Sequence, residues 1–293
     1  MNINGRIQNR DQAVLSVFDR GFLYGDSVYE TVRTYEGIPF LLDRHLKRLT
    51  ASAERIAIPG PSEAYISREV SRTREQAGEG EWLIRIVVTR GETPYWPEGR
   101  PVGLDPAAFQ KPSLIVYLVP FLEGIPELQE SGVAVSIVPI RRNSTASLDP
   151  RIKSSNQLNN ILAVAAASRD SSYEAIMLNP EGFVAEGASS NLFIVRNGEL
   201  MTPPLGAGIL EGITREVVFQ LAGELGMPFR EVDFLPQDLR DAEEAFLTSS
   251  IKEIMPIVRC NGHPVGSGRP GRQSVKLLER FHQMVRTSHR SHR

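Results

Sequence analysis

Hydrophobic and polar residues alternate in a regular way along the first part of the chain. The runs VYETVRTY, WLIRIVVTRG and SLIVYLVPF are apolar or alternate with a period of two, which is typical of strands with one buried face. Between the first two runs, a segment that begins at Asp43 places apolar residues three and four positions apart, and this spacing predicts a helix. We therefore expect residues 1–119 to form a small mixed α+β unit.

The pattern changes near residue 120. The segment PFLEGIPELQESG contains two prolines and several acidic residues, and the alternating run VAVSIVPI follows it. This predicts an interdomain linker over residues 120–131 and a larger second domain over 132–293. Within the first domain, Gly91 to Pro112 is rich in glycine and proline and fits no regular element, so it is a candidate lid over a site.

Composition narrows the classes of function. The 33 basic and 35 acidic residues give a net charge of -2, so no global field favours nucleic acid or an anionic membrane. A single cysteine, Cys260, excludes an internal disulfide framework and a cysteine-based metal cluster. No apolar run is long enough for a membrane span. We expect a cytoplasmic protein that acts on small molecules and has no metal site.

Lys153 is the first candidate for chemistry. It stands in LDPRIKSSNQLNNILAVAAA, where Pro150 keeps the preceding chain extended, and an apolar helix face follows. The residues expected on that face are Leu158, Ile161, Leu162 and Ala165. A lysine held in apolar surroundings loses its proton more readily, and a neutral amine can form a Schiff base. The alternative is an ordinary solvated lysine.

A carboxylate follows before a predicted hairpin. In GFVAEGASSNLFIVRNGELMTPP, Asn197 and Gly198 lie between two apolar runs, which is a strong signal for a two-residue turn. Glu186 ends the strand before this hairpin. It can be a surface carboxylate beside a turn, or the partner of a protonated pyridine nitrogen.

A helix N-terminus later in the chain is a candidate anion site. Gly212 precedes the amphipathic run ITREVVFQLAGELG. The first backbone N–H groups of a helix have no partner in the helix and attract anions, so Ile213 and Thr214 are the expected donors to a phosphate. Because every helix has such an end, the feature permits a phosphate site without requiring one.

Two more segments carry possible phosphate ligands. LTSSIKEI contains the hydroxyls of Thr248, Ser249 and Ser250, which can complete a phosphate site or simply bond within a turn. The helix predicted from Asp43 has apolar residues on one face and charged or polar ones on another. The apolar face is Leu46, Leu49, Ala53 and Ile56, and the other is His45, Arg48 and Arg55. Arg48 can reach a phosphate or remain a solvated arginine.

The strand VYETVRTY presents a possible substrate surface. Tyr29, Thr31 and Arg33 share one of its faces, because side chains in a strand alternate. Tyrosine and arginine on such a face suit a substrate carboxylate, although ordinary half-buried strands also carry them.

Taken in order, these segments resemble the class IV aminotransferases, also called fold-type IV pyridoxal-phosphate enzymes, from DRGFLYGDSVYE to PIVRCNGHPVG. The motifs IKSSNQLNNILA, VAEGASSNLFIV, LMTPPLGAGILEGITR and LTSSIKEI follow one another in the family's order and approximate spacing, which a single chance match does not produce. The resemblance implies a two-domain α+β fold like that of D-amino acid aminotransferase. It also implies a homodimer with sites near the interface.

The resemblance further implies roles for single residues. Lys153 is expected to carry pyridoxal 5'-phosphate and to move the proton, and Glu186 to pair with the pyridine nitrogen. The expected cofactor residues are Arg48, Lys153, Glu186, Asn191, Ile213, Thr214, Ser249 and Ser250. The expected substrate contacts are Tyr24, Tyr29, Arg33, Arg85 and Arg90. By the same resemblance, Tyr24 and the loop from Gly91 to Pro112 are expected to serve the neighbouring subunit.

The choice of substrate is left open between subgroups. LDPRIKSSNQLNNILA, the GLDP after the loop, and Arg33 look most like the branched-chain members, which exchange an amino group between Leu, Ile or Val and 2-oxoglutarate. Yet Gln157 stands where those often have tyrosine, and D-amino acid transaminases tend to have an apolar residue there. The arginine and histidine that their loop uses are replaced around Tyr95 to Pro97.

We hypothesise an L-amino acid transaminase of branched-chain type. The alternatives on the same fold are a D-amino acid transaminase, an aminodeoxychorismate lyase and an R-selective amine transaminase. A non-catalytic module that only binds the cofactor is a further alternative, against which the presence of both Lys153 and Glu186 argues. A G-x-G-x-x-G pattern at Gly266, Gly268 and Gly271 lacks a βαβ context and predicts a turn.

Overall fold

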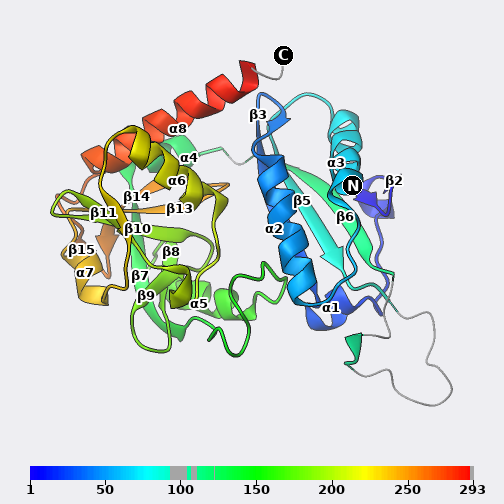
Figure 1. Ribbon diagram of the computed structural model, residues 1–293, viewed down its shortest axis with the longest axis horizontal. Helices are drawn as coiled ribbons and strands as arrows, with labels where there is room; N and C mark the ends of the chain where they lie inside the picture. Colours follow the sequence, from blue (N-terminus) through cyan, green and yellow to red (C-terminus); the bar gives the residue numbers. More distant parts are fainter. Residues whose placement is uncertain (93–103, 107–110, 122, 291–293) are drawn as a thin grey trace. The chain divides into compact units, whose positions relative to one another are not determined.

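A computed structural model describes residues 1–92, 104–106, 111–121 and 123–290 of the chain (Figure 1). The chain forms two compact units. Unit 1 comprises residues 1–121 together with 152–157, and unit 2 comprises residues 122–151 and 158–293. The predicted lid, Gly91 to Pro112, falls mostly outside the described residues, and so do the positions Tyr95 to Pro97.

Unit 1 is built on a six-stranded antiparallel sheet in the order β2-β1-β6-β5-β3-β4. Its strands are β1 (Asn2–Ile3), β2 (Arg6–Ile7), β3 (Ser27–Tyr35), β4 (Ile38–Pro39), β5 (Trp82–Thr89) and β6 (Ser113–Pro120). The three long strands, β3, β5 and β6, are those that the hydrophobic pattern predicted. Along β3 every second residue from Val28 to Thr34 is buried, as one covered face requires.

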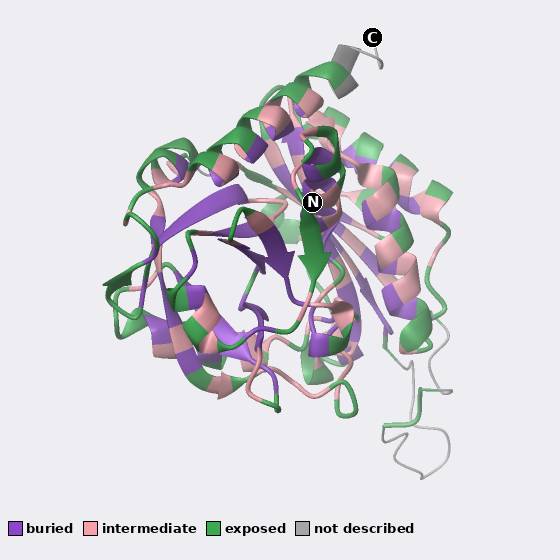
Figure 2. Cartoon of the chain, turned by 60° about the vertical axis from the view of Figure 1, so that its left-hand side comes forward, coloured by how far each residue is buried: buried purple, intermediate pink, exposed green. Residues whose placement is uncertain are grey.

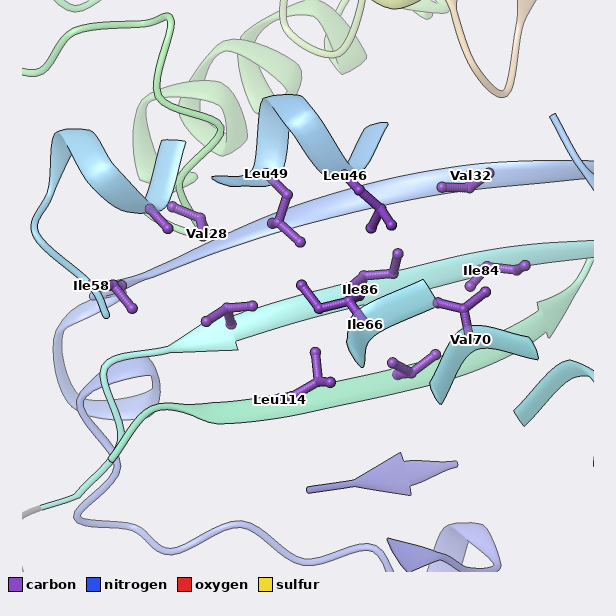
Figure 3. Packing of buried hydrophobic residues seen from close by; sticks show 13 residues of the cluster. Val28, Val32, Leu46, Leu49, Ile58, Ile66, Val70, Ile84, Ile86 and Leu114 are labelled. Atoms are coloured by element: carbon purple, nitrogen blue, oxygen red, sulfur yellow. The ribbon is translucent and has the colours of Figure 1, made fainter. Parts of the chain in front are cut away.

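Two helices cover that face. The helices of unit 1 are η1 (Arg10–Gln12), α1 (Arg20–Tyr24), α2 (Leu42–Arg55) and α3 (Glu63–Ala77). Figure 3 shows the core in which α2 and α3 meet β3, β5 and β6. The labelled core residues are Val28, Val32, Leu46, Leu49, Ile58, Ile66, Val70, Ile84, Ile86 and Leu114. The half-buried Tyr29, Thr31 and Arg33 of β3 lie on the opposite face of the sheet, so they share a face as predicted.

The helix predicted from Asp43 is α2, and one detail of its expected faces is wrong. His45, placed with the polar residues, is 2% exposed and lies among the buried residues of α2. Burial of this polar ring is possible because its Nδ1 lies 2.7 Å from a carboxylate oxygen of Glu30 on β3. The hydrogen bond to Glu30 thus replaces the hydrogen bonds to water that His45 would make on an exposed face.

Unit 2 is built on a nine-stranded sheet in the order β12-β11-β10-β13-β14-β7-β8-β9, with β15 also paired to β14. The strands are β7 (Val133–Arg141), β8 (Glu174–Leu178), β9 (Val184–Gly187), β10 (Asn191–Arg196), β11 (Glu199–Thr202), β12 (Phe229–Glu231), β13 (Glu244–Ser249), β14 (Glu253–Cys260) and β15 (His263–Pro264). Only residues 188–190 separate β9 from β10, although the two stand far apart in the strand order. The sheet must therefore curl to bring them together.

The strands β8, β9 and β10 of this sheet are almost continuously buried (Figure 2). Around it lie α4 (Ile125–Ser131), α5 (Leu158–Ser168), the 3-10 helix Leu205–Ala207, α6 (Ile213–Glu224), α7 (Pro236–Arg240) and α8 (Arg272–Arg290). The predicted turn joins β10 to β11, where Arg196 pairs with Glu199. Its two residues, Asn197 and Gly198, have φ of 52° and 73°, as a tight turn of this kind requires.

The predicted linker needs correction. Residues 125–131 form α4, which packs in unit 2. Pro126 does not interrupt this helix, because it stands in the first helical turn, where no backbone N–H bond is lost. Gln129 of α4 donates to Lys252 O and to Glu253 Oε2. Unit 1 also takes residues 152–157 out of the region predicted as one domain.

The apolar face predicted for the helix after Lys153 is present, but it is not a buried face. Leu158, Ile161 and Leu162 of α5 are 62%, 59% and 49% exposed. The helix instead packs on β7 and β8 through the small residues Ala163 and Ala167. A row of alanines lets a helix approach a sheet closely, and it leaves the larger side chains outside. No helix of the described chain is long and apolar enough to cross a membrane.

Candidate active site

Lys153 is held by the edge of the unit 1 sheet. The N–H of Tyr29 donates to Lys153 O (2.9 Å) and the N–H of Ser155 donates to Ser27 O (2.9 Å). Short β4 pairs only with the far end of β3, so this end of β3 has an edge to which residues 153–155 can bond. The backbone N–H of Lys153 also donates to Ser52 Oγ on α2 (3.2 Å). The backbone of the lysine is thereby fixed to two elements.

The side chain of Lys153 lies against Tyr29. Its Nζ is 4.7 Å from the centroid of the Tyr29 ring, and the Arg85 guanidinium carbon lies 3.5 Å from the same centroid. Arg85 also donates to Thr31 Oγ1 (2.8 Å), its partner in the register of β3 and β5. Both cations therefore face one aromatic ring, an arrangement that the negative ring face favours.

Apolar residues flank this ring. In the sheet register Tyr29 lies opposite Val87, and Val87 lies opposite Ile115. All three side chains are half-buried and share the uncovered face of the sheet. This face of unit 1 thus offers an amine, a guanidinium and a row of apolar side chains.

Arg48 is oriented by a buried carboxylate. Its Nε and Nη2 donate to the two oxygens of Glu30 at 2.7 and 2.9 Å, and Glu30 is fully buried. Burial alone would raise the pKa of the Glu30 carboxyl, but Arg48 and His45 together hold that pKa well below its usual range. Burial lowers the pKa of His45, and the nearby Arg48 and Lys153 lower it further. Glu30 acts in the opposite direction and raises it, but the net shift is downward. We therefore describe His45 as a neutral ring that donates to Glu30.

Arg33 and Tyr24 are two further predicted substrate contacts in unit 1. Arg33 stacks on the rings of Tyr35 and Phe121, with centroid distances of 4.3 and 3.7 Å. It is four residues along β3 from Tyr29, roughly 13 Å at the usual rise per residue. Tyr24 is the last residue of α1 and is 52% exposed.

Arg90 is corrected to a structural role. It is 3% exposed, and its guanidinium donates to both Asp26 oxygens and to the carbonyls of Ile56 and Ala57 at 2.6 to 3.0 Å. These bonds use most of the donors that an arginine has. We therefore remove Arg90 from the proposed substrate contacts.

Glu186 occupies a polar cradle in unit 2. It is 4% exposed, and its Oε2 accepts from the backbone N–H of Leu210 (3.0 Å) and from Asn191 Nδ2 (3.2 Å). Its Oε1 forms an ion pair with Arg142 Nη2 at 2.8 Å. The amide of Asn191 also donates to Leu210 O (2.8 Å). The carboxylate of Glu186 is thus held in position by a cation and two amide donors.

Arg142 was missed by the sequence reasoning. It stands just after β7, and its Nη1 donates to Asn160 Oδ1 of α5 (2.9 Å). The signal was available: if Glu186 is an ionised buried carboxylate, a cation must lie near it, and the pair Arg141–Arg142 stands at the end of a strand in the same domain. Whether Arg141 or Arg142 points into the domain depends on the residue at which β7 ends, and the hydrophobic pattern does not determine that residue.

The start of α6 fits an anion site. Gly212 is the N-cap residue, and a Cβ there would lie 1.9 Å from Asn191 Oδ1, so only glycine allows this close approach. With no side chain at Gly212 to accept from them, the N–H groups of Ile213 and Thr214 depend on another acceptor. The helix N-terminus therefore begins beside the residue that supports Glu186.

The turn after β13 lies near the same strands. Asn191 of β10 pairs with Thr248 of β13, and Ser249 and Ser250 follow. The Ser249 hydroxyl accepts from the backbone N–H of Lys252 (3.1 Å) and so closes the turn. Unit 2 therefore brings Glu186, Asn191, the start of α6 and this turn together, whereas unit 1 brings together Lys153, Arg48, Tyr29 and Arg85.

Comparison with known proteins identifies the family. The model of the class IV aminotransferases matches residues 27–260, and the chain belongs to this family. A candidate branched-chain-amino-acid aminotransferase of Methanocaldococcus jannaschii is 38% identical over 95% of this chain and 94% of its own length. D-alanine aminotransferase of Bacillus licheniformis is 34% identical over 92% and 90%. Aminodeoxychorismate lyase of Bacillus subtilis is 32% identical over 90% and 88%.

Solved structures agree with this assignment. A branched-chain aminotransferase from Thermoproteus uzoniensis, determined with norvaline, has a TM-score of 0.87 and 33% identity over 97% of this chain and 93% of its own. The PLP form of a branched-chain amino acid aminotransferase from Thermobaculum terrenum has a TM-score of 0.84 and 28% identity over 97% and 92%. The predicted α+β fold of class IV aminotransferases is confirmed, and the chain is an enzyme of this aminotransferase family.

Proposed function

We propose that this chain is a pyridoxal-phosphate-dependent aminotransferase that moves the amino group of a branched-chain L-amino acid to a 2-keto acid such as 2-oxoglutarate. The observation that carries the proposal is the surface beside Lys153. There Arg85 and the Lys153 amine approach the same Tyr29 ring, and Val87 and Ile115 continue the face. An aliphatic side chain fits the apolar row, and a second carboxylate fits the guanidinium.

The residues present suit the cofactor. Unit 2 supplies the buried Glu186 carboxylate, a suitable acceptor for a pyridinium N–H, and N–H donors at Ile213 and Thr214 for a phosphate. Because Gly212 has no side chain, Asn191 Oδ1 can lie against this backbone, and the start of α6 comes beside the residue that supports Glu186. Unit 1 would supply Lys153, whose amine can bond an aldehyde carbon, and Arg48. We assign the hydroxyl of Ser250 to the phosphate, with Ser249 and Asn191 in supporting roles.

Within this proposal each residue has a defined task. When bound, pyridoxal phosphate supplies an electron sink that makes the α-proton of the substrate acidic. The Lys153 amine would take that proton from the substrate α-carbon and return it at the former aldehyde carbon of the cofactor, as a general base and then a general acid. Glu186 would accept a hydrogen bond from the ring nitrogen, and Arg142 and the N–H of Leu210 hold its carboxylate in place. Water would release the keto acid by hydrolysis, and a second keto acid would take the amino group by the reverse steps.

Arg85 is our preferred contact for the acceptor's distal carboxylate. It stacks on the ring that Lys153 contacts, whereas Arg33 stacks on Tyr35 and Phe121. Tyr29 is proposed to line the substrate on the same face. Gln157, which replaces the tyrosine often found in branched-chain members, donates to Ser154 O (2.6 Å) and closes the turn that follows Lys153.

The test is a comparison of donors and acceptors on the purified enzyme with pyridoxal phosphate. We expect L-leucine, but not D-alanine, to bleach the long-wavelength absorbance band and to form glutamate from 2-oxoglutarate. Arg85→Leu should raise KM for 2-oxoglutarate by about tenfold or more, because a charge-assisted hydrogen bond is lost. KM for 4-methyl-2-oxopentanoate should change little, and Arg33→Leu is the matched control.

Other outcomes identify the alternatives. Turnover of D-alanine without L-leucine would replace the proposal with a D-amino acid transaminase, the activity named for the Bacillus licheniformis relative. Pyruvate released from aminodeoxychorismate without an amino acceptor would indicate the lyase, and turnover of R-1-phenylethylamine an amine transaminase. Binding of the cofactor without turnover of any donor would leave a non-catalytic module.

We also propose a homodimer. Unit 1 exposes an apolar segment before and within α1, in which Val14, Val17, Phe18 and Phe22 are each at least 60% exposed. Surfaces of this kind mark interfaces, and the exposed face of α5 in unit 2 is a second one. Sedimentation should give twice the chain mass of 32.5 kDa, and a monomer at micromolar concentration would contradict this. A cytoplasmic location remains a prediction from composition.

A further inference from the structure

The side chain of Lys252 turns inward at the turn between β13 and β14. The residue is 9% exposed, and its Nζ forms an ion pair with Glu174 and donates to Ser189 Oγ (2.7 Å). The ammonium also lies 5.3 Å from the centroid of the Tyr173 ring. The predicted phosphate turn therefore contains a cation directed into unit 2, and neither the sequence reasoning nor the proposed mechanism gives it a task.

The partner of Lys252 gathers donors from two turns. Glu174, the first residue of β8, is 2% exposed. Its Oε2 accepts from Lys252 Nζ, from Ser189 Oγ (2.7 Å) and from Ser190 Oγ (3.0 Å). Ser189 and Ser190 form the link between β9, which carries Glu186, and β10, which begins at Asn191. One carboxylate thus joins the turn that carries Ser250 to the turn that follows Glu186.

The space around this carboxylate is tightly defined. A Cβ at Gly187 would lie 2.5 Å from Ser190 Oγ and 3.1 Å from Glu174 Cγ, so a larger residue there would displace the network. On the other side of the turn, Glu253 binds Gln129 Nε2 (3.0 Å) and His282 Nε2 (2.8 Å), which come from α4 and α8. Glu253 has φ of 55°, a conformation uncommon outside glycine. The turn is therefore anchored on both sides.

The chemistry favours a positioning role over a stabilising one. A buried ion pair is weak evidence of stability, because its desolvation offsets most of the attraction, and apolar residues of similar volume often serve as well. What the pair supplies is a fixed direction and distance between the groups that it joins. Here those groups are the turn that carries Ser250, a proposed phosphate ligand, and the turn that lies between Glu186 and Asn191.

We propose that Lys252 is a positioning residue. Through Glu174 and Ser189 it sets the place of the 249–252 turn relative to the 188–190 turn, and thereby the affinity of the enzyme for the phosphate of its cofactor. This inference rests on the proposed function, since it requires that the enzyme bind pyridoxal phosphate. It predicts a defect specific to the phosphate group and not a general loss of cofactor binding.

The experiment compares pyridoxal phosphate with pyridoxal, which lacks the phosphate. Wild type, Lys252→Met and the double variant Lys252→Met/Glu174→Gln are titrated with each compound, followed by the absorbance band. We expect both variants to bind pyridoxal phosphate about tenfold or more weakly, in the range known for outer-shell partners of a bound ligand. Pyridoxal should bind within about twofold of wild type. Lys276→Met, at an exposed position of α8, removes the same charge and should change neither constant.

The double variant keeps the test open if Lys252→Met alone does not fold, since it leaves no unpaired buried carboxylate. Equal affinity of the variants and wild type for pyridoxal phosphate would overturn the inference. A loss of the same size for pyridoxal and pyridoxal phosphate, together with a lower thermal midpoint of the apoenzyme, would also overturn it and indicate a structural role. If wild type itself bound neither compound, the proposed function would fail, which is a separate result.

Discussion

Lys153 and Glu186 differ in how their surroundings restrain the reacting group, which is the Nζ amine of Lys153 and the carboxylate of Glu186. Lys153 is fixed through its backbone, by bonds to Tyr29 and Ser52, while its Nζ contacts the face of an aromatic ring. Glu186 is fixed through the carboxylate itself, by Leu210, Asn191 and Arg142. Among the described residues, no hydrogen bond or ion pair to the Lys153 Nζ is present.

This difference matches what the two groups must do in the proposed reaction. An amine that bonds, leaves and carries a proton must be able to move, and a carboxylate that keeps a ring nitrogen protonated must not. Aromatic contact restrains a lysine without a directional bond, whereas charged hydrogen bonds fix both distance and direction. The position of a catalytic residue can therefore be fixed through the backbone or through its reacting atoms, and only the first leaves the reacting atoms free to move.

The largest effect should come from the mobile group. Lys153→Ala removes the base and the attachment point, so we expect the rate of amino transfer to fall by roughly 10²–10⁴-fold. The long-wavelength absorbance band of the holoenzyme should be lost, while thermal unfolding of the apoenzyme stays close to wild type. Rapid mixing with L-leucine measures the rate. A variant that kept both the band and the rate would remove Lys153 from the centre of the mechanism.

A smaller effect should test the fixed group. Arg142→Gln leaves the Glu186 carboxylate buried without its cation, and we expect the free energy of unfolding to fall by about 3 kcal/mol. Replacing both, in Arg142→Gln/Glu186→Gln, should recover much of this stability but not the activity. Denaturant unfolding of the apoenzymes gives the comparison. Independent, additive losses in the double variant would mean that the ion pair does not hold Glu186.

The smallest effect concerns the network that orients Arg48. The pKa of buried His45 is lowered, so below its unfolded pKa of about 6.5 the unfolded chain binds more protons than the native one. Stability of the native state is therefore complete above that pH and falls as the pH drops. The pKa of Glu30 is also lowered, which adds a further loss only below about pH 4.5.

His45→Gln should remove the loss of stability below about pH 6.5, which comes from His45, and should leave the loss at lower pH, which comes from Glu30. Urea unfolding at pH 7.5 and pH 5.5 would show a smaller difference between the two pH values in the variant than in wild type. Arg55→Gln, at an exposed position on the same helix, is the control. An unchanged pH dependence in His45→Gln would show that other groups cause the loss of stability.

Much of the fold and part of the site followed from local patterns. The strands β3, β5, β6 and β7, the hairpin at Asn197–Gly198 and the helix after Gly212 were predicted because period, turn chemistry and capping are properties of neighbouring residues. The errors came from contacts with distant residues. Pro126 was interpreted as a break although it stands in a first helical turn, and His45 was placed on a polar face although Glu30 makes its burial possible.

Among the candidate residues, type and order pointed to Lys153, Glu186 and Arg48, but the partners of each were not predictable. Arg85 and Arg90 looked equivalent in sequence, five residues apart on and just after one strand. The structure separates them, because Arg85 lies over the Tyr29 ring and Arg90 is enclosed by Asp26 and two backbone carbonyls.

The sequence by itself determined the family, the periodic elements and the residues whose chemistry has no ready substitute, since these depend on residue type and local spacing. Tertiary structure alone decided that residues 152–157 bond to the edge of β3, that Arg142 pairs with Glu186, and that Lys252 turns inward to Glu174. The physical reason is that a buried charge or backbone polar group must be paired, and its partner is the group that tertiary packing places next to it. Those partners come from positions far along the sequence, and no local pattern records them.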